Sequence, residues 1–246
     1  MNKYILILFT FLFNYSYAQQ GWNTDPQFPE NQIKEAWDEG RDISSLSYGN
    51  GVWALVTTKI PGDYLQSWFT RTYFPKEKIK ENWDEGRYIT SVNYGNGAWV
   101  VVMSKIPGYA GQRWFTDSSF PKDKIKESWD AGKYITSLTY GNGVWAVVMT
   151  EFPLFTSQSY STSYDFPEEE IQQGWDDGKY ITSLNYCNGL WVLVMSGVPT
   201  GGGQNYSTSY SFPKDKIKEG WDKGMYITNL TYGDGTWILV MSGTLF

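Results

Sequence analysis

The hydrophobic pattern changes twice within the segment from Phe120 to Met149, near copies of which recur along the chain. Pro121 opens its first part, where Ile125 and Trp129 lie four residues apart among charged residues and Gly132 follows. Proline at the start, an apolar pair at i and i+4, and glycine just past the end are typical of a helix of about two to three turns. The segment is therefore predicted to begin with a short amphipathic helix.

Two strands are predicted after the helix. Residues 134–140, YITSLTY, alternate between the two faces and are rich in β-branched and aromatic residues, as strands are. Residues 144–150, VWAVVMT, form a nearly continuous apolar run, which indicates a strand that is covered on both faces. Asn142-Gly143 between them is the preferred pair for a tight two-residue hairpin turn.

A variable loop and a third strand complete the predicted unit. The third strand begins at Gln112 with QRWFTDS, and equivalent segments begin at Gln66, Gln158 and Gln204. The loops before these segments differ in every copy and cover residues 59–65, 105–111, 151–157 and 197–203. The predicted order is helix, strand, hairpin, strand, loop, strand. The alternative is a four-stranded unit in which the predicted helix is an extended outer strand.

The unit recurs five times at a fixed period of 46 residues. Its landmarks are a tryptophan near the end of the helix and another in the second strand: Trp37, Trp83, Trp129, Trp175 and Trp221, then Trp53, Trp99, Trp145, Trp191 and Trp237. Periods of 20–50 residues are typical of solenoids, propellers and arrays, in which one unit cannot bury its apolar faces alone. Each large ring buries about 150–250 Å², roughly 4–6 kcal/mol gross at about 25 cal/mol per Å². Packing is therefore the expected role of these tryptophans.

The two ends of the chain favour a closed ring over an open solenoid. The chain ends at Phe246, after the second strand of the fifth unit, while Gln20 and Trp22 match Gln66 and Trp68 in phase. The N-terminal strand is therefore expected to complete the last unit, so that no sheet edge is left bare. We predict a mainly β, monomeric, five-bladed toroid of the β-propeller type, with about three antiparallel strands and a short helix per blade.

The first residues are typical of an export signal. Lys3 precedes an apolar run from Tyr4 to Phe13, and a small-x-small motif ends at Ala18. The run is shorter than the about 20 residues that cross a bilayer. We predict a signal peptide over residues 1–18 and a single five-repeat domain over residues 19–246, secreted or periplasmic and without a membrane anchor.

The composition of the chain argues against several classes of function. The chain has a net charge of −6 and no histidine. Nucleic acids are bound by clustered Lys and Arg, and histidine is the commonest general base and zinc ligand. The single cysteine, Cys187, cannot form an internal disulfide. The sequence therefore predicts no nucleic-acid partner, no metal, no cofactor and no catalytic residue.

An aspartate follows the first tryptophan of every unit: Asp38, Asp84, Asp130, Asp176 and Asp222. We expect its carboxylate to accept backbone N–H groups at the turn into the next strand. Carboxylates spaced one unit apart do not form the pair, roughly 5–9.5 Å apart, on which glycoside hydrolysis depends. A hydrolase with an Asp/Glu site at the central channel is therefore only a lesser alternative.

The segment WDAGKYITSLTYGNGVWAVVMT, followed by a Gln-aromatic strand and Phe-Pro, resembles the C-terminal repeat domain of plant casein-kinase-I-like protein kinases. The likeness covers essentially all of residues 20–246 and implies a repeat fold used for interaction, with no active site. The export signal is a departure from those intracellular proteins, and no kinase signature is present. Circular five-bladed lectins of the tachylectin type look similar in blade count and unit length, a likeness of architecture alone.

Candidate ligand-binding residues lie in the third strands and the variable loops. A flat aromatic ring beside a side-chain amide suits sugar binding. The candidates are Gln20, Trp22, Gln66, Trp68, Gln112, Trp114, Gln158, Tyr160, Gln204 and Tyr206, with Tyr64 and Tyr109 in the loops. Because the pair recurs in all five units, packing is the competing role.

These patterns together predict a secreted, non-catalytic binding module. Multivalent carbohydrate binding of the lectin kind is the favoured function, since weak repeated sites gain by avidity. A scaffold for protein partners is the alternative from a different class.

Overall fold

A computed structural model describes residues 19–244, apart from residues 61, 63, 107–109 and 200–201. The predicted signal peptide over residues 1–18 lies outside the described residues. The described chain is mainly β and contains five helices and five antiparallel three-stranded sheets. The repeated, β-rich organisation predicted from the sequence is thereby confirmed.

Each repeat unit contains a strand, a helix and two further strands, in that order. Unit 1 has β1 (Gln20–Asp25), α1 (Glu30–Asp38), β2 (Asp42–Gly49) and β3 (Val52–Thr58). The same elements form unit 2 as β4 (Ser67–Arg71), α2 (Lys76–Asp84), β5 (Tyr88–Gly95) and β6 (Ala98–Ser104), and unit 3 as β7 (Ala110–Asp117), α3 (Lys122–Asp130), β8 (Tyr134–Gly141) and β9 (Val144–Glu151). They form unit 4 as β10 (Ser157–Ser163), α4 (Glu168–Asp176), β11 (Lys179–Cys187) and β12 (Leu190–Gly197), and unit 5 as β13 (Gln204–Ser209), α5 (Lys214–Asp222), β14 (Tyr226–Gly233) and β15 (Thr236–Ser242).

The strand order within a sheet corrects the predicted unit boundary. In unit 1 the order is β1-β3-β2, and Gln20 of β1 lies opposite Thr58 of β3. The prediction that the N-terminal strand completes the last unit's sheet is therefore wrong: β13 fills that place by pairing with β15. In a tandem repeat the boundary of the unit can be drawn at any position of the period. The sequence therefore did not reveal that each outer strand belongs to the same sheet as the strands after the following helix.

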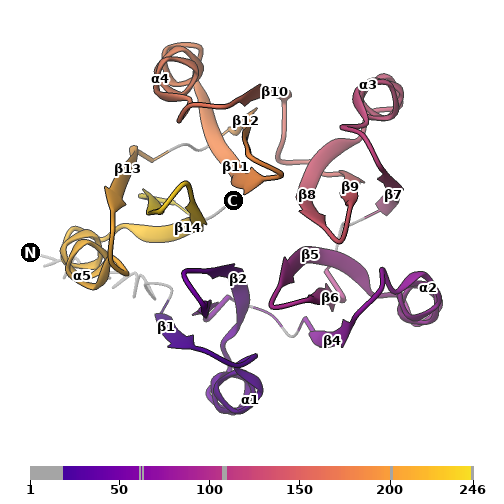
Figure 1. Cartoon of the computed structure of the whole chain (residues 1–246), viewed down its shortest axis with the longest axis horizontal. Helices are drawn as coiled ribbons and strands as arrows, with labels where there is room; N and C mark the ends of the chain where they lie inside the picture. Colours follow the sequence, from indigo (N-terminus) through magenta and orange to yellow (C-terminus); the bar gives the residue numbers. More distant parts are fainter. Residues whose placement is uncertain (1–18, 61, 63, 107–109, 200–201, 245–246) are drawn as a thin grey trace, which may run out of the picture.

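The five units lie around a common centre. Figure 1 shows the helices at the periphery and the inner strands β2, β5, β8, β11 and β14 nearest the middle. Each inner strand contacts the next, and β14 contacts β2, so the cycle of contacts has no break. No hydrogen-bonded ladder joins two units anywhere in the described ranges, because each unit is a separate sheet. We call the contact between neighbouring units a seam.

The helices form where the sequence predicts them. In unit 3, Ile125 is fully buried and its N–H donates to the Pro121 carbonyl (3.0 Å), so proline stands directly before the helix rather than at its first position. The helix ends at Asp130. Gly132, two residues later, has a φ of 74° that suits glycine, and the Gly132 and Lys133 N–H groups donate to the Trp129 and Ser128 carbonyls. The alternative of an extended strand at this position is wrong.

The predicted hairpin turns are also confirmed. Asn142 and Gly143 have φ values of 46° and 81°, which is the left-handed pair that a type I′ turn requires. β8 and β9 then pair with Tyr140 opposite Trp145. The same positive-φ pair occurs in the other units at Asn50-Gly51, Asn96-Gly97, Asn188-Gly189 and Asp234-Gly235.

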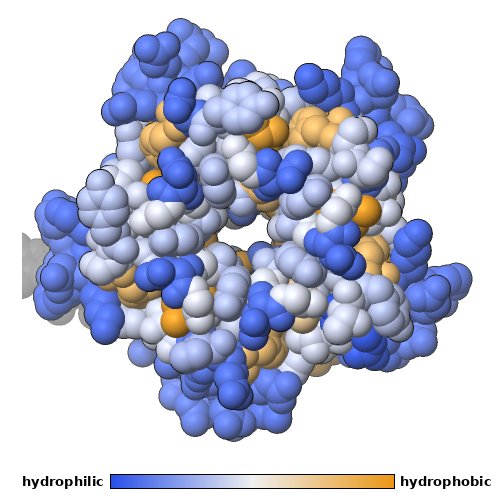
Figure 2. Space-filling model, viewed as in Figure 1, coloured by the Kyte–Doolittle hydropathy of each residue, from blue (hydrophilic) through white to orange (hydrophobic). Residues whose placement is uncertain are grey.

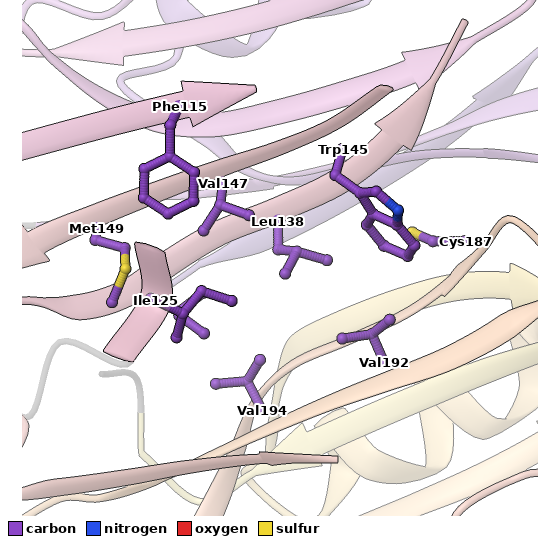
Figure 3. Close-up of a cluster of buried hydrophobic side chains, with 10 residues drawn as sticks. Phe115, Ile125, Leu138, Trp145, Val147, Met149, Cys187, Val192 and Val194 are labelled. Carbon is purple, nitrogen blue, oxygen red and sulfur yellow. The ribbon is translucent and has the colours of Figure 1, made fainter. Parts of the chain in front are cut away.

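The hydrophobic core extends across the seams. Trp145 is buried to 2% exposure. Around it, Phe115 and Ile125 of unit 3 belong to the same cluster as Val192 and Val194 of unit 4 (Figure 3). A single unit therefore does not enclose its own core, and neighbouring units complete it, as the repeat period indicates.

Candidate functional site

The glutamine that begins each outer strand bonds to the inner strand of the preceding unit. Gln112 Oε1 accepts hydrogen bonds from Trp83 Nε1 (3.1 Å) and the Ile89 N–H (2.8 Å). Gln112 Nε2 donates to the Ile89 carbonyl (2.9 Å) and to Thr150 Oγ1 of its own unit (3.0 Å). The inner strand is a sheet edge, and the amide satisfies backbone groups that no ladder reaches.

The same arrangement, which we call the glutamine clasp, occurs at all five seams. It is made by Gln20, Gln66, Gln112, Gln158 and Gln204. Gln20 bonds to Trp221 Nε1 (3.2 Å) and to both backbone groups of Ile227 (2.8 and 3.0 Å), so it joins unit 1 to unit 5. Residue 20 therefore reaches the last unit through its side chain and not through strand pairing.

The clasp occupies the full hydrogen-bonding capacity of these five candidate residues. An amide side chain offers two acceptor lone pairs and two N–H donors, and the clasp uses all four. A sugar hydroxyl would bind such an amide only by replacing an existing hydrogen bond.

The aromatic partners of the glutamines lie half-buried on the outer side of each seam. Trp114 packs on Phe74 of the preceding unit with ring centroids 5.1 Å apart, and it also contacts Trp83 at 6.3 Å. Equivalent pairs across the other seams are Trp22–Phe212, Trp68–Phe28, Tyr160–Phe120 and Tyr206–Phe166. One side of each ring is thus covered by protein.

Tyr206 is additionally fixed by an acidic neighbour. Its hydroxyl donates to Glu168 Oε1 of unit 4 (3.0 Å). Burial, with the adjacent Glu168 carboxylate, raises the pKa of Tyr206 to about 12. Of the two loop candidates, Tyr64 is half-buried and its carbonyl accepts from the Lys105 N–H (2.6 Å), while Tyr109 lies outside the described residues.

The repeated aspartates do not bond as predicted. Asp84, Asp130 and Asp222 accept from the lysine four residues earlier on the exposed helix side, at 2.6–2.7 Å. Asp176 accepts instead from Gln172 Nε2 (2.9 Å). The predicted bonds to turn N–H groups are wrong. At the end of the helix the turn N–H groups, such as that of Gly132, donate to backbone carbonyls of the helix, and the carboxylates remain on the helix surface.

Cys187 lies at a seam and not at a reactive surface. At the equivalent positions of the other units a glycine faces a tyrosine of the preceding unit, and a Cβ at Gly141 would lie 2.1 Å from Tyr94 Cγ. Cys187 is buried to 5% exposure, and burial raises the pKa of its thiol to about 12.

Two exposed tyrosines were not among the sequence candidates. Tyr164 and Tyr210 are 81% and 86% exposed and occupy equivalent places in the turn after the outer strand of units 4 and 5. The strand register puts this turn at the hairpin end of the sheet, since Ser163 lies opposite Trp191. The sequence did contain a signal, because the other units have Pro26, Thr72 and Ser118 at this position.

A groove lies between the outer strand and the helix of unit 4. It measures about 410 Å³; Leu193 and Met195 line it, as do the carboxylates of Glu169, Glu170 and Asp177. The groove is at the periphery of the molecule, beside α4, and not at the centre between the units, where the lesser alternative of a hydrolase expects an Asp/Glu site.

Two further observations concern metals and membranes. Within residues 19–244, excluding the undescribed positions, no three His, Cys, Asp or Glu side chains gather as a metal-binding group. No helix in this described part is both long and apolar enough to span a bilayer.

Comparison with known proteins gives a family but no function. The family model "Domain of unknown function (DUF7477)" matches residues 32–187 and again residues 175–245. The overlapping matches are consistent with tandem units. No curated protein matches the chain. The resemblance to the repeat domain of plant kinases stays a prediction.

Proposed function

For this chain, which belongs to the DUF7477 family, we propose that the function is non-catalytic, multivalent binding of carbohydrate by an exported protein. The proposal has three parts: a closed ring of the β-propeller type, export through the N-terminal signal, and sugar binding at exposed tyrosines. Sugar binding at the exposed tyrosines is the function itself, and the closed ring explains why equivalent sites face the same way.

The closed ring is supported by the cycle of inner-strand contacts and by the clasp of Gln20 on unit 5. Units related by a common geometry present equivalent turns on one side of a ring. In Figure 2 most of the face toward the viewer is hydrophilic or neutral, and an opening lies at the centre. Such a face suits a polar ligand better than a large apolar interface.

The observation that carries the proposal is the exposure of Tyr164 and Tyr210 in neighbouring units. A ring exposed to more than four-fifths contributes little to folding, so its presence has no explanation in packing. A tyrosine offers a flat apolar face for the C–H side of a sugar ring and a hydroxyl for a hydrogen bond. The Asp165 N–H donates to Ser163 Oγ (3.2 Å), which orders the turn that holds Tyr164.

Two equivalent rings on one face favour a ligand that repeats, such as a polysaccharide. A single stacking contact is weak, whereas two linked contacts gain by effective concentration. Export is supported by the sequence of residues 1–18 and places the protein where extracellular glycans occur.

A glycan array probed with residues 19–246 tests the proposal. We expect binding to immobilised glycans, a loss of at least about tenfold in avidity for Tyr164→Ala or Tyr210→Ala, and no detectable binding for the double variant. Folding should be unchanged because both rings are exposed. Tyr73→Ala is the matched control. Tyr73 is 59% exposed and lies in the same turn of unit 2, one residue after Thr72, which is equivalent to Tyr164. Binding that survives the double variant would contradict the assignment of these tyrosines.

A protein-binding scaffold is the second candidate function. It is favoured by Leu65 and Leu154, which are 50% and 45% exposed in the variable loops at the other end of the sheets. If the protein binds no glycan on the array, this function would be supported by a protein partner that binds the wild type and does not bind the Leu65→Ser or Leu154→Ser variant.

A further inference from the structure

The groove of unit 4 has a counterpart in unit 3 that is filled by the protein's own side chains. In unit 3, Phe115 is buried against the helix residue Ile125. Two cations lie over the Phe115 ring, the Arg113 guanidinium at 5.7 Å and the Lys124 ammonium at 5.8 Å from the centroid. Each is neutralised within the unit, because Arg113 pairs with Glu127 (2.9 Å) and Lys124 pairs with Asp117 (2.7 Å).

Unit 4 lacks all three of these groups. The residues 46 positions after Arg113, Phe115 and Lys124 are Ser159, Ser161 and Glu170. The groove of about 410 Å³ opens at this place, with Ser159, Ser161 and Glu170 among its lining residues. The Oγ atom of Ser161 is buried and has no hydrogen-bond partner among the described residues.

The acidic groups of the groove remain without a cation. Among the described residues, Glu169, Glu170 and Asp177 form no ion pair within 4.0 Å. Lys179 lines the groove as well, but its ammonium donates to Ser159 Oγ (3.2 Å). One lysine opposite three carboxylates leaves the groove negative.

The charge on helix α4 distinguishes this unit from the others. Residues 168–177 include five acidic and no basic residues. The equivalent residues 214–223 of unit 5 include three acidic and four basic residues. The equivalent residues 30–39 of unit 1 include four acidic residues and one basic residue, so α4 is the most acidic of the five helices and the only one without a basic residue.

We propose that the groove between β10 and α4 binds a protonated amine carried on an apolar chain. The ammonium group takes the place that Arg113 and Lys124 occupy in unit 3, beside the carboxylates of Glu169 and Glu170. The methylene chain lies against Leu193, Met195 and the half-buried Tyr160 ring, which also line the groove. The site is distinct from the exposed tyrosines and does not depend on sugar binding.

Binding should be weak, because the carboxylates are exposed and each exposed ion pair contributes little. We expect dissociation constants on the order of 1–10 mM. Raising the salt concentration should weaken binding, because screening acts strongly on exposed charges.

Titration of ¹⁵N-labelled residues 19–246, followed by NMR, tests the proposal. The probes are cadaverine, as a free polyamine, and Nα-acetyl-lysine methylamide, as a peptide side chain. Nα,Nε-diacetyl-lysine methylamide has the same chain without the charge. Saturable shifts at residues 159–161 and 173–179 with either amine, and none with the uncharged probe, support the site. The tighter of the two amines identifies the source of the ligand.

Two matched pairs of variants locate the site. Glu170→Lys should weaken amine binding at least about fivefold, whereas Glu168→Lys makes the same charge change on a residue that bonds Tyr206 and does not line the groove. Ser159→Arg restores the residue type of unit 3 and should block binding, whereas Asn205→Arg makes the equivalent change in unit 5 without effect. Melting curves check that each variant folds.

The proposal is overturned if neither amine gives saturable shifts up to about 50 mM, or if the uncharged probe binds as well as the charged ones. It is also overturned if Glu168→Lys weakens binding as much as Glu170→Lys, since the attraction would then come from net charge alone. Glycan binding through Tyr164 and Tyr210 is unaffected by any of these outcomes.

Discussion

The seams are alike in all five units, whereas the surfaces between outer strand and helix differ from unit to unit. At every seam a glutamine makes the same four hydrogen bonds to its neighbours, within a few tenths of an ångström. The outer grooves lie only one residue further along the same strands, yet they hold an aromatic ring and two cations in unit 3 and exposed carboxylates in unit 4. Residues repeated in all units therefore hold neighbouring units together, and residues that differ between units are where binding should be sought.

The seam between units 5 and 1 sharpens this rule. No peptide connection crosses it, yet Gln20 bonds to Trp221 and Ile227 as Gln112 does to Trp83 and Ile89. The clasp is thus present where no linker joins the units, together with packing across the seam such as that of Trp22 on Phe212. Comparing equivalent substitutions at the two seams separates what the clasp contributes from what chain connectivity contributes.

The largest expected effect is the loss of a clasp. Gln112→Ala leaves the Trp83 Nε1–H and both backbone groups of Ile89 without partners, and we expect a loss of about 2–3 kcal/mol in the free energy of unfolding. Gln20→Ala should cost a similar amount and, because no linker crosses its seam, should also expose the Ile227 amide to hydrogen exchange. Urea unfolding and native-state hydrogen exchange measure both.

Gln173→Ala is the control for this comparison. Gln173 is exposed on α4 and bonds only to Asp177 in the described structure, so its loss should stay within about 0.5 kcal/mol. Equal stability of the Gln112 and Gln173 variants would show that water replaces the clasp and that packing alone holds the seams.

The sequence predicted the helices and hairpins better than it predicted which strands pair with one another. The spacing of Ile125 and Trp129, the glycine after the helix and the Asn142-Gly143 pair each determine local geometry, and the helix and hairpin formed there. Which unit an outer strand joins depends on three-dimensional proximity, and a perfect tandem repeat contains no information on phase. For that reason the N-terminal strand was assigned to the wrong sheet.

The candidate site shows the same limit. A glutamine beside a tryptophan has the composition of a sugar site, but the edge of the preceding inner strand, which the sequence does not place nearby, binds the amide. The differences at Ser159, Ser161 and Glu170 are visible in the sequence. Their meaning required the structure, which brings the three residues to one groove.

An intermediate effect on stability is expected at the seam between units 3 and 4, where Cys187 replaces the glycine of the other units. Cys187 is buried, and burial raises the pKa of its thiol from 9.0 to about 12. The folded protein therefore keeps the proton at a pH where the unfolded chain loses it. The stabilising contribution is present in full below pH 9 and is lost as the pH rises toward 12, by about 1.4 kcal/mol at pH 10.

Comparison of the wild type with Cys187→Ala across pH 8–11 measures this contribution, because the variant lacks the titrating group. The difference in unfolding free energy between the two should be constant to pH 9 and then move against the wild type. The native thiol should also remain unreactive toward a disulfide reagent at pH 8 and react fully in urea. Rapid reaction of the native protein would show that the seam between units 3 and 4, at which Cys187 lies, opens in the folded state.

The smallest expected effect concerns α4, the one helix whose repeated aspartate has no lysine four residues earlier in the sequence. On α2, α3 and α5 that aspartate pairs with a lysine at i−4, whereas Asp176 of α4 bonds to Gln172. Gln172→Lys gives α4 the same pair, and a single exposed i,i+4 ion pair should raise the melting temperature by about 1 °C at low salt. The gain should vanish near 1 M NaCl, where the screening length is about 3 Å. Because residue 172 does not line the groove, amine binding should change far less than in Glu170→Lys. A larger rise that persists in salt would mean that the acidic surface of α4 repels itself. In that case its charge would reduce the stability of unit 4 as well as create the binding groove.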